Sequence, residues 1–223
     1  MSDREPVPVA VVGGGNMGAN HIRVYGELPD AQLVGVVEPD PDRAQEIADE
    51  YHVPVVGQVD DLEGASAVTI AVPNRFHREV AETCIDRGLD VLVEKPLATS
   101  VEEAEAIADA AEEAGAILQV GHIERFNPAV EMLHDLLDTM TVLAIETHRL
   151  GPFNEHLTNE SVVFDLLIHD VDIIRSILGD DIDKIRGMGL KHKSETWDQA
   201  TAMLQDPGSV AVLTASHITH GKV

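Results

Sequence analysis

Two sets of residues have types and spacings that could carry out acid–base chemistry on a substrate. In Glu94-Lys95-Pro96, an ammonium group follows a buried strand predicted over residues 89–94. Asp165, His169 and Asp172 occur at positions i, i+4 and i+7, so they would share one face of a helix predicted over residues 162–178. A histidine and a lysine at one substrate oxygen could remove a hydroxyl proton and stabilise the negative charge that develops there.

Each set also has a purely structural interpretation. Lys95 could be a solvated loop residue, although only five of the 15 basic residues are lysines and this one directly follows a strand. His169 could be a packed histidine, and Asp165 a carboxylate placed near a helix N-terminus. Taken alone, the residue types leave both interpretations open.

A glycine-rich segment near the start of the chain predicts a dinucleotide site. An apolar run over residues 7–12 is typical of a buried parallel strand, and Gly13-x-Gly15-x-x-Gly18 follows it. A helical pattern comes next, with Gly26 as its expected end. In such a turn the first glycine permits the sharp bend, the second lets a pyrophosphate approach the backbone, and the third allows the helix to pack on the strand. Amides at the helix start would hold the phosphates.

Glu38 lies 20 positions after the last glycine and ends a second apolar strand over residues 33–37. A carboxylate at this position accepts hydrogen bonds from ribose hydroxyls and repels a 2′-phosphate, so NAD is favoured over NADP. The alternatives are a glycine-rich turn that holds no ligand, and a 2′-phosphate held by Arg43.

Strands alternate with helices up to about residue 122, which predicts a Rossmann-type doubly wound parallel sheet over residues 1–122. This alternation of strands and helices then stops. Strands over residues 182–190, 198–206 and 209–218 follow one another without intervening helices, and Asp206-Pro207-Gly208-Ser209 is typical of a hairpin turn. We therefore expect an α+β domain with an open, largely antiparallel sheet over residues 123–223.

The chain is strongly acidic, with 40 Asp and Glu against 15 Lys and Arg and a formal net charge of −25 in 223 residues. Binding to nucleic acid or to an anionic membrane needs a basic patch, so neither is an expected partner. The acids are spread through predicted helices, as in proteins of a high-salt cytoplasm, but an ordinary acidic protein has the same composition. Cys84 is the single cysteine, and no segment reads as a signal peptide or a membrane span, so a reducing, cytoplasmic location is expected.

In these motifs the chain resembles the glucose–fructose oxidoreductase and inositol 2-dehydrogenase family, also called Gfo/Idh/MocA. The motifs that carry the similarity are Gly13-x-Gly15-x-Met17-Gly18, Ala71-Val72-Pro73-Asn74-x-x-His77, Glu94-Lys95-Pro96 and Asp165-x-x-x-His169-x-x-Asp172. Within the family, Gly121-His122-Ile123-Glu124-Arg125-Phe126-Asn127-Pro128 is most similar to the UDP-N-acetylglucosamine 3-dehydrogenase branch. The resemblance implies a dehydrogenase that uses NAD to act on a sugar or cyclitol hydroxyl, and a homo-oligomer formed through the C-terminal sheet.

The resemblance also implies roles for individual residues. Lys95 and His169 would be catalytic, with Asp165 beside them to orient the imidazole. The substrate would contact His122, Arg125 and Asp172. The residues expected around the cofactor are Gly13, Gly15, Asn16, Met17, Gly18, Glu38, Pro73, Asn74, His77, Glu94 and Lys95.

Two further expectations complete this interpretation. Family members usually continue beyond the position that corresponds to Val223, so we expect a fragment or a shortened member. Eleven histidines, among them His148, His156 and His169, raise the alternative of a metal site, but the sequence has no tight ligand spacing and we expect none. A sugar- and NAD-binding sensor without catalysis is the alternative from another functional class.

Overall fold

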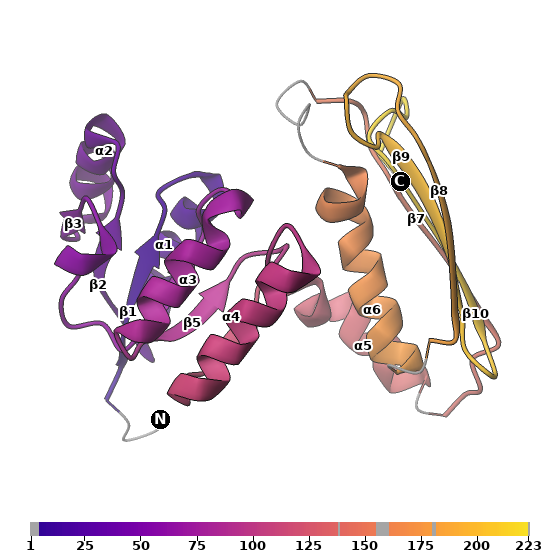
Figure 1. The fold of residues 1–223 in the computed structure, drawn as a ribbon, viewed down its shortest axis with the longest axis horizontal. Helices are drawn as coiled ribbons and strands as arrows, with labels where there is room; N and C mark the ends of the chain where they lie inside the picture. The colour runs from indigo at the N-terminus through magenta and orange to yellow at the C-terminus, as the bar shows by residue number, and fades with distance from the viewer. Residues whose placement is uncertain (1–4, 138, 155–160, 180–181, 223) are drawn as a thin grey trace. The chain divides into compact units, whose positions relative to one another are not determined.

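The computed structural model describes residues 5–137, 139–154, 161–179 and 182–222, and the chain divides into two compact units, Met1–Gly121 and His122–Val223 (Figure 1). The sequence-based division places the domain boundary one residue later, after residue 122.

The first unit is built on six parallel strands in the order β3-β2-β1-β4-β5-β6. This order reverses direction between β1 and β4, which is the switch point where ligands bind in doubly wound sheets. The predicted doubly wound sheet is therefore confirmed. The strands are β1 (Val7–Val12), β2 (Ala31–Val37), β3 (Val55–Val56), β4 (Ala67–Ile70), β5 (Asp90–Val93) and β6 (Leu118–Val120).

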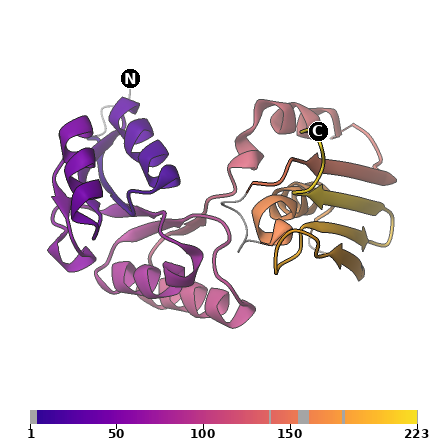
Figure 2. The same cartoon turned by 90° about the horizontal axis from the view of Figure 1, so that it is seen from above.

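Helices cover both faces of this sheet (Figure 2). Because side chains alternate along a strand, Val11 packs on one face against Ile22 and Ile47, and Ala10 packs on the other face with Ile85 and Ile107. The helical elements are α1 (Asn16–Glu27), α2 (Pro41–Tyr51), η1 (Val59–Asp61), η2 (Asn74–Phe76), α3 (His77–Asp86) and α4 (Val101–Ala114).

Local capping signals explain several of these boundaries. The Asp40 carboxylate accepts a hydrogen bond from the Arg43 amide at the start of α2, and the Ser100 hydroxyl accepts one from the Glu103 amide at the start of α4. One expectation was wrong, because Gly26 lies inside α1 rather than ending it. Asn74 begins the short η2, and no side chain caps this element.

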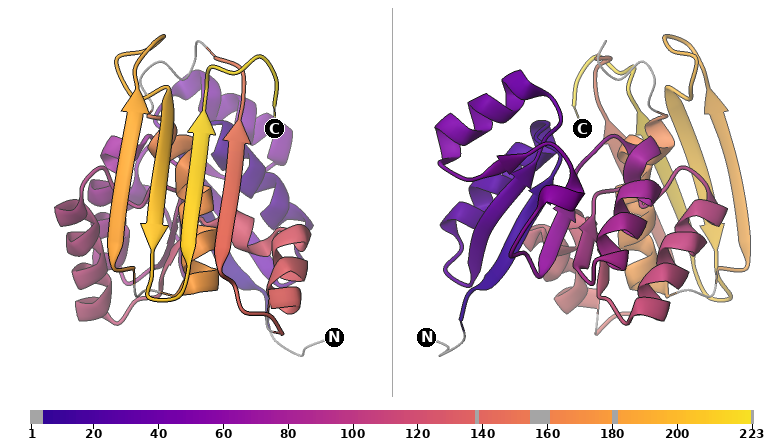
Figure 3. Two further views of the ribbon diagram at one scale, coloured as in Figure 1. Left: turned by 90° about the vertical axis from the view of Figure 1, so that its right-hand side faces the viewer. Right: turned by 60° about the vertical axis from the view of Figure 1, so that its left-hand side comes forward.

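The second unit contains a four-stranded mixed sheet in the order β7-β10-β9-β8 (Figure 3). β10 runs parallel to β7 and antiparallel to β9, and β9 runs antiparallel to β8, so the sheet is largely antiparallel as expected. The Asp206 carboxylate accepts bonds from the Gly208 and Ser209 amides in the turn that joins β9 to β10. The strands are β7 (Ala144–Leu150), β8 (Lys184–Leu190), β9 (Gln199–Gln205) and β10 (Val210–Ser216).

One face of this sheet is covered by the segment that carries Asp165 and His169. Its side chains Val162, Leu167 and Ile174 form a core with strand residues that include Leu204 and Leu213. The helical elements of the unit are η3 (Ile123–Phe126), α5 (Pro128–Leu137), the π-helical turn η5 (Val163–Leu167) and α6 (Ile168–Leu178).

The prediction of one continuous α-helix over residues 162–178 was therefore wrong in its first turn. A π-helix forms i→i+5 hydrogen bonds and is wider than an α-helix, so the i, i+4, i+7 rule does not place Asp165, His169 and Asp172 on one face. Single π turns inside helices occur frequently at functional sites. Among the helices that the structure describes, none is both long and apolar enough to cross a membrane.

Candidate functional site

The turn between β1 and α1 has the close backbone packing that the glycine pattern predicts. Gly13 has φ +99°, and a Cβ placed on it would lie 2.7 Å from the Ala71 carbonyl oxygen. A Cβ on Gly18 would lie 1.8 Å from the Gly13 carbonyl oxygen, so no other residue fits where helix and strand meet. A Cβ on Gly15, in contrast, would meet no atom within 4 Å, which leaves this part of the turn open to a ligand.

Gly15, Asn16 and Met17 form an exposed start to α1. Gly15 is the N-cap residue, and no side chain caps the helix here. The first amides of a helix have no partner within it, so this end of α1 offers donors and a positive dipole to phosphate groups. The geometry of the loop fits the pyrophosphate of NAD.

Gly14 occupies the first variable position of the Gly13-x-Gly15-x-x-Gly18 motif. A Cβ on it would lie 2.3 Å from Cδ1 of Ile47 and 2.9 Å from Oε2 of Glu38. The Gly14 amide donates to that same oxygen at 2.8 Å. Packing at the end of β2 therefore demands glycine at this position. A third consecutive glycine is the signal in the sequence that could have indicated it.

Glu38 lies beside the glycine turn as predicted. Its carboxylate accepts hydrogen bonds from the Gly14 amide at 2.8 Å and from the Asp40 amide at 3.0 Å. Arg43, the alternative phosphate ligand, donates through Nε to the Gly14 carbonyl and through Nη1 to Glu46, both at 2.8 Å. The negative charge at this edge is thus fixed in place next to the loop.

We expect the protein to bind NAD roughly tenfold or more tightly than NADP, because a 2′-phosphate at the end of β2 would lie against the Glu38 carboxylate. Titration of the protein with each reduced cofactor, followed by nicotinamide fluorescence, measures the preference. Glu38→Gln should reduce it, whereas Glu46→Gln, which alters only the outer partner of Arg43, should leave it unchanged. Equal affinities of the unsubstituted protein for both cofactors would contradict the assignment.

His77 ties together the two loops that follow β4 and β5. Its side chain is fully buried, with Nδ1 2.9 Å from the Pro96 carbonyl and Nε2 3.0 Å from the Val72 carbonyl. Pro73 and Asn74 lie in the first of these loops, and the Lys95–Pro96 peptide, which is cis, lies in the second. Direct contact of His77 with the cofactor was the prediction. Its burial supports a different role, because it can act on a ligand only through the loops that it holds.

Glu94, also predicted near the cofactor, is buried and paired with His21 of α1, a residue that sequence reasoning missed. The His21 Nε2 and Glu94 Oε1 atoms are 2.7 Å apart, and the Lys95 amide donates to Oε2 at 3.2 Å. Burial opposes ionisation of Glu94, but these bonds outweigh it and hold its pKa below the usual value. Gly121 is adjacent, since a Cβ on it would lie 3.0 Å from this carboxylate. The half-buried Lys95 thus follows a strand end whose carboxylate is firmly held.

In the second unit, Asp165 is paired with His217, which directly follows β10. Nε2 of His217 and Oδ2 of Asp165 are 3.0 Å apart, and His217 is 3 % exposed. No local pattern in the sequence indicates this partner, which is 52 residues away along the chain. His169 is the second residue of α6, the regular part of the helix, which begins at Ile168.

The predicted substrate residues Arg125 and Asp172 bind each other. Nε and Nη2 of Arg125 donate to the two carboxylate oxygens of Asp172 at 2.7 and 2.6 Å, and His122 Nδ1 lies 3.9 Å from Oδ1. Asp172 is 7 % exposed. The buried carboxylate is thus used to anchor η3 on α6, and this contact supports a structural role for it.

A second arginine connects the same elements. Arg149 of β7 donates to both carboxylate oxygens of the buried Asp170 at 3.1 and 3.2 Å, and it lies 3.5 Å from Glu124 of η3. The segment that opens the second unit is therefore attached to α6 directly through Arg125 and indirectly through Arg149.

Within the ranges that the structure covers, no group of three or more His, Cys, Asp or Glu side chains is arranged to hold a metal ion. Of the histidines named for a metal site, His148 lies 3.0 Å from Glu146, and His156 lies outside the described residues.

A six-stranded sheet in this order, with a glycine turn at the switch point and a carboxylate at the end of β2, defines a dinucleotide-binding α/β protein. Residues 7–122 match the Gfo/Idh/MocA oxidoreductase family with its NAD-binding Rossmann fold, and residues 142–223 match the C-terminal domain of that family. The chain therefore belongs to the Gfo/Idh/MocA family. The resemblance stated from the motifs is confirmed, and so is NAD as the predicted cofactor.

Two relatives illustrate the range of the family. The chain is 34 % identical to UDP-N-acetylglucosamine 3-dehydrogenase of Acidithiobacillus ferrooxidans over 93 % of its own length and 66 % of the relative's. It is 30 % identical to inositol 2-dehydrogenase 1 of Saccharopolyspora erythraea over 96 % of its length and 65 % of the relative's. The chain thus spans about two thirds of the length of these relatives.

Solved structures agree with this assignment. The structure of the Acidithiobacillus ferrooxidans enzyme superposes with a TM-score of 0.92 at 32 % identity, covering 98 % of this chain and 72 % of that one. GenD2 from gentamicin A biosynthesis, solved in complex with NAD, has a TM-score of 0.90 at 27 % identity, covering 99 % and 68 %.

Proposed function

We propose that this protein is an NAD-dependent dehydrogenase that oxidises or reduces a secondary hydroxyl of a sugar. The observation that carries the proposal is the switch-point edge of the first unit, where the open Gly15 turn, the fixed Glu38 carboxylate and Lys95 all follow strand ends. The Asp165 and His169 motif in the second unit adds a carboxylate and an imidazole.

In the proposed mechanism, Lys95 and His169 act on the same substrate hydroxyl. His169 takes the proton as the alcohol becomes a ketone, and Lys95 stabilises the negative charge that develops on the oxygen. His217 holds one oxygen of Asp165 and so fixes this carboxylate near the start of the helix that carries His169, where Asp165 orients the imidazole. When NAD is bound, its nicotinamide ring would accept the hydride.

We propose a nucleotide sugar such as UDP-N-acetylglucosamine as the substrate. Support comes from the 34 % identity to the UDP-N-acetylglucosamine 3-dehydrogenase, against 30 % for the inositol 2-dehydrogenase. Inositol or a free sugar is the second candidate substrate. A sensor that binds NAD and sugar without catalysis is the alternative from another class.

A panel assay separates these candidates. Protein, NAD and one sugar at a time are mixed, and the absorbance of reduced nicotinamide is followed. We expect turnover with UDP-N-acetylglucosamine and little with inositol or free glucose. Turnover with inositol alone would replace the substrate assignment. Tight NAD binding without turnover on any compound would favour the sensor.

We further propose a cytoplasmic homo-oligomer assembled through the outer face of the C-terminal sheet. Support comes from the large apolar side chains of this face, because Met188, Leu190 and Met203 are 78 %, 52 % and 45 % exposed. Cys84, the single cysteine, is a buried free thiol whose pKa burial raises to about 12, so it is unreactive and compatible with a reducing compartment.

A further inference from the structure

The loop that joins β8 to β9, Lys191–Asp198, presents two lysines to solvent in a protein that has few lysines. Lys191 and Lys193 are two of only five lysines in a chain of net charge −25, and both are exposed. Glu195 is the single other charged side chain of this loop that faces solvent. We call this segment the basic loop.

A buried carboxylate holds the basic loop in one shape. Asp198 is 1 % exposed, and its Oδ2 accepts hydrogen bonds from the amides of His192, Lys193 and Ser194 at 2.5, 2.6 and 3.1 Å. Burial opposes ionisation of Asp198, but the three amides outweigh it and keep its pKa well below the usual range. The carboxylate of Asp198 therefore binds backbone amides of the loop itself. These hydrogen bonds hold the backbone that carries the lysines in place before any ligand binds.

Lys191 is positioned by the only tryptophan of the chain. Its Nζ lies over the ring of Trp197, 5.5 Å from the centroid, which is a cation–π arrangement. The ring also packs on β8, because a Cβ on Gly189 would lie 2.5 Å from Cε3 of Trp197. Gly189 is paired with Ala200, whose side chain belongs to the core under α6, so Trp197 lies on the face of the sheet that α6 covers.

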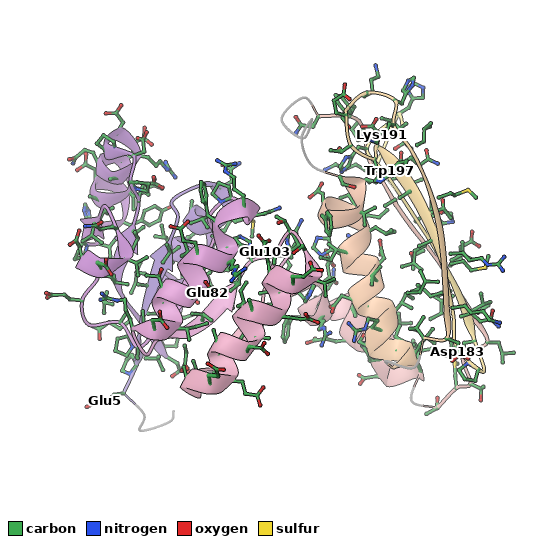
Figure 4. All side chains as sticks on the ribbon, in the orientation of Figure 1. Glu5, Glu82, Glu103, Asp183, Lys191 and Trp197 are labelled. Atoms are coloured by element: carbon green, nitrogen blue, oxygen red, sulfur yellow. The ribbon has the colours of Figure 1, made fainter. Side chains whose placement is uncertain are left out.

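The basic loop is bonded directly to the elements that carry Asp165. The Val162 amide, three residues before Asp165, donates to the Trp197 carbonyl at 2.8 Å. The His217 amide donates to the Asp198 carbonyl at 2.8 Å, and the same histidine holds Asp165 through its ring. Figure 4 places Lys191 and Trp197 together at one end of the sheet and Asp183, next to Lys184, at the other.

We propose that the basic loop binds the diphosphate of a nucleotide-sugar substrate through Lys191 and Lys193. This inference rests on the proposed function, which it deepens by assigning the phosphate-binding residues. A diphosphate approaching a protein of charge −25 is repelled overall, so its binding needs local cations, and lysine binds phosphate as a point charge. The loop supplies two such cations on an organised backbone beside Asp165.

The single tryptophan provides a readout that does not require turnover. A phosphate that draws Lys191 away from the ring alters the surroundings of Trp197, so uridine diphosphate should change the tryptophan fluorescence saturably. Uridine, which has no phosphate, should not. Isothermal titration calorimetry with uridine diphosphate gives the affinity independently of any optical change.

The test compares three variants. The double variant Lys191→Ala/Lys193→Ala should bind uridine diphosphate roughly tenfold or more weakly, because two charge-assisted contacts are lost. Lys191→Arg/Lys193→Arg should retain most of the affinity. Lys184→Ala, at the other end of β8 and about 20 Å away, should match the unsubstituted protein. All these side chains are exposed, so the fold should be unaffected.

NAD affinity serves as the internal control, because NAD also carries a diphosphate but is assigned to the glycine turn. It should be the same in all variants. Unchanged affinity of the double variant for uridine diphosphate, or equal losses with Lys184→Ala, would overturn the inference even if the protein oxidises nucleotide sugars. If no sugar is turned over but the double variant loses uridine diphosphate binding, the proposed function fails and the inference about the loop stands.

Discussion

Replacing His169 with alanine should lower turnover on the true substrate by roughly 10²–10⁴-fold, the usual contribution of a positioned acid–base group. NAD affinity should barely change, because the glycine turn and Glu38 belong to the first unit and stay intact. Stopped-flow or steady-state measurement of nicotinamide absorbance gives the rate, and a cofactor titration gives the affinity. Added imidazole should restore part of the activity if the lost group is a base.

His148→Ala is the matched control. His148 lies on β7 with its side chain 46 % exposed, and its partner is the exposed Glu146, so its loss should affect neither rate nor affinity. Near-normal turnover of His169→Ala would show that the helix is a packing element. Lys95 would then be the remaining acid–base candidate.

Replacing Lys95 with alanine should lower turnover by roughly 10²–10³-fold, the cost of removing one group that stabilises an oxyanion. Because Lys95 lies two residues after the end of β5, at the edge where the cofactor is expected, some loss of NAD affinity should accompany the change. The expected pattern thus differs from that of His169→Ala, which leaves NAD binding intact. Rates and cofactor affinities measured on the same preparations distinguish the two.

Lys184→Ala again serves as the control, since it removes one exposed lysine from the second unit and gives the same change in net charge. A Lys95→Ala protein with full activity would refute the assignment of Lys95 as the oxyanion partner. Loss of NAD affinity with unchanged turnover at saturating NAD would reassign Lys95 to cofactor binding alone.

The sequence by itself determined the dinucleotide-binding half of this protein. The β1 strand, the glycine turn, the helix start and Glu38 at the end of β2 are found as predicted, because each depends on contiguous residues with a steric requirement. Gly18, for example, must lack a Cβ to pass the Gly13 carbonyl. The parallel arrangement of the strands in this half could likewise be predicted from the alternation of strands and helices, since right-handed crossovers leave few possible topologies.

Only the tertiary structure decided which polar side chains are paired. His21 with Glu94, Arg125 with Asp172 and His217 with Asp165 are 73, 47 and 52 residues apart in the chain. Such pairs depend on sheet register and helix packing, and no local pattern encodes them. The π turn at Val163–Leu167 escaped prediction for a related reason. Apolar spacing shows that a helix has a buried face, but packing against the sheet selects whether its first turn closes with i→i+4 or i→i+5 bonds.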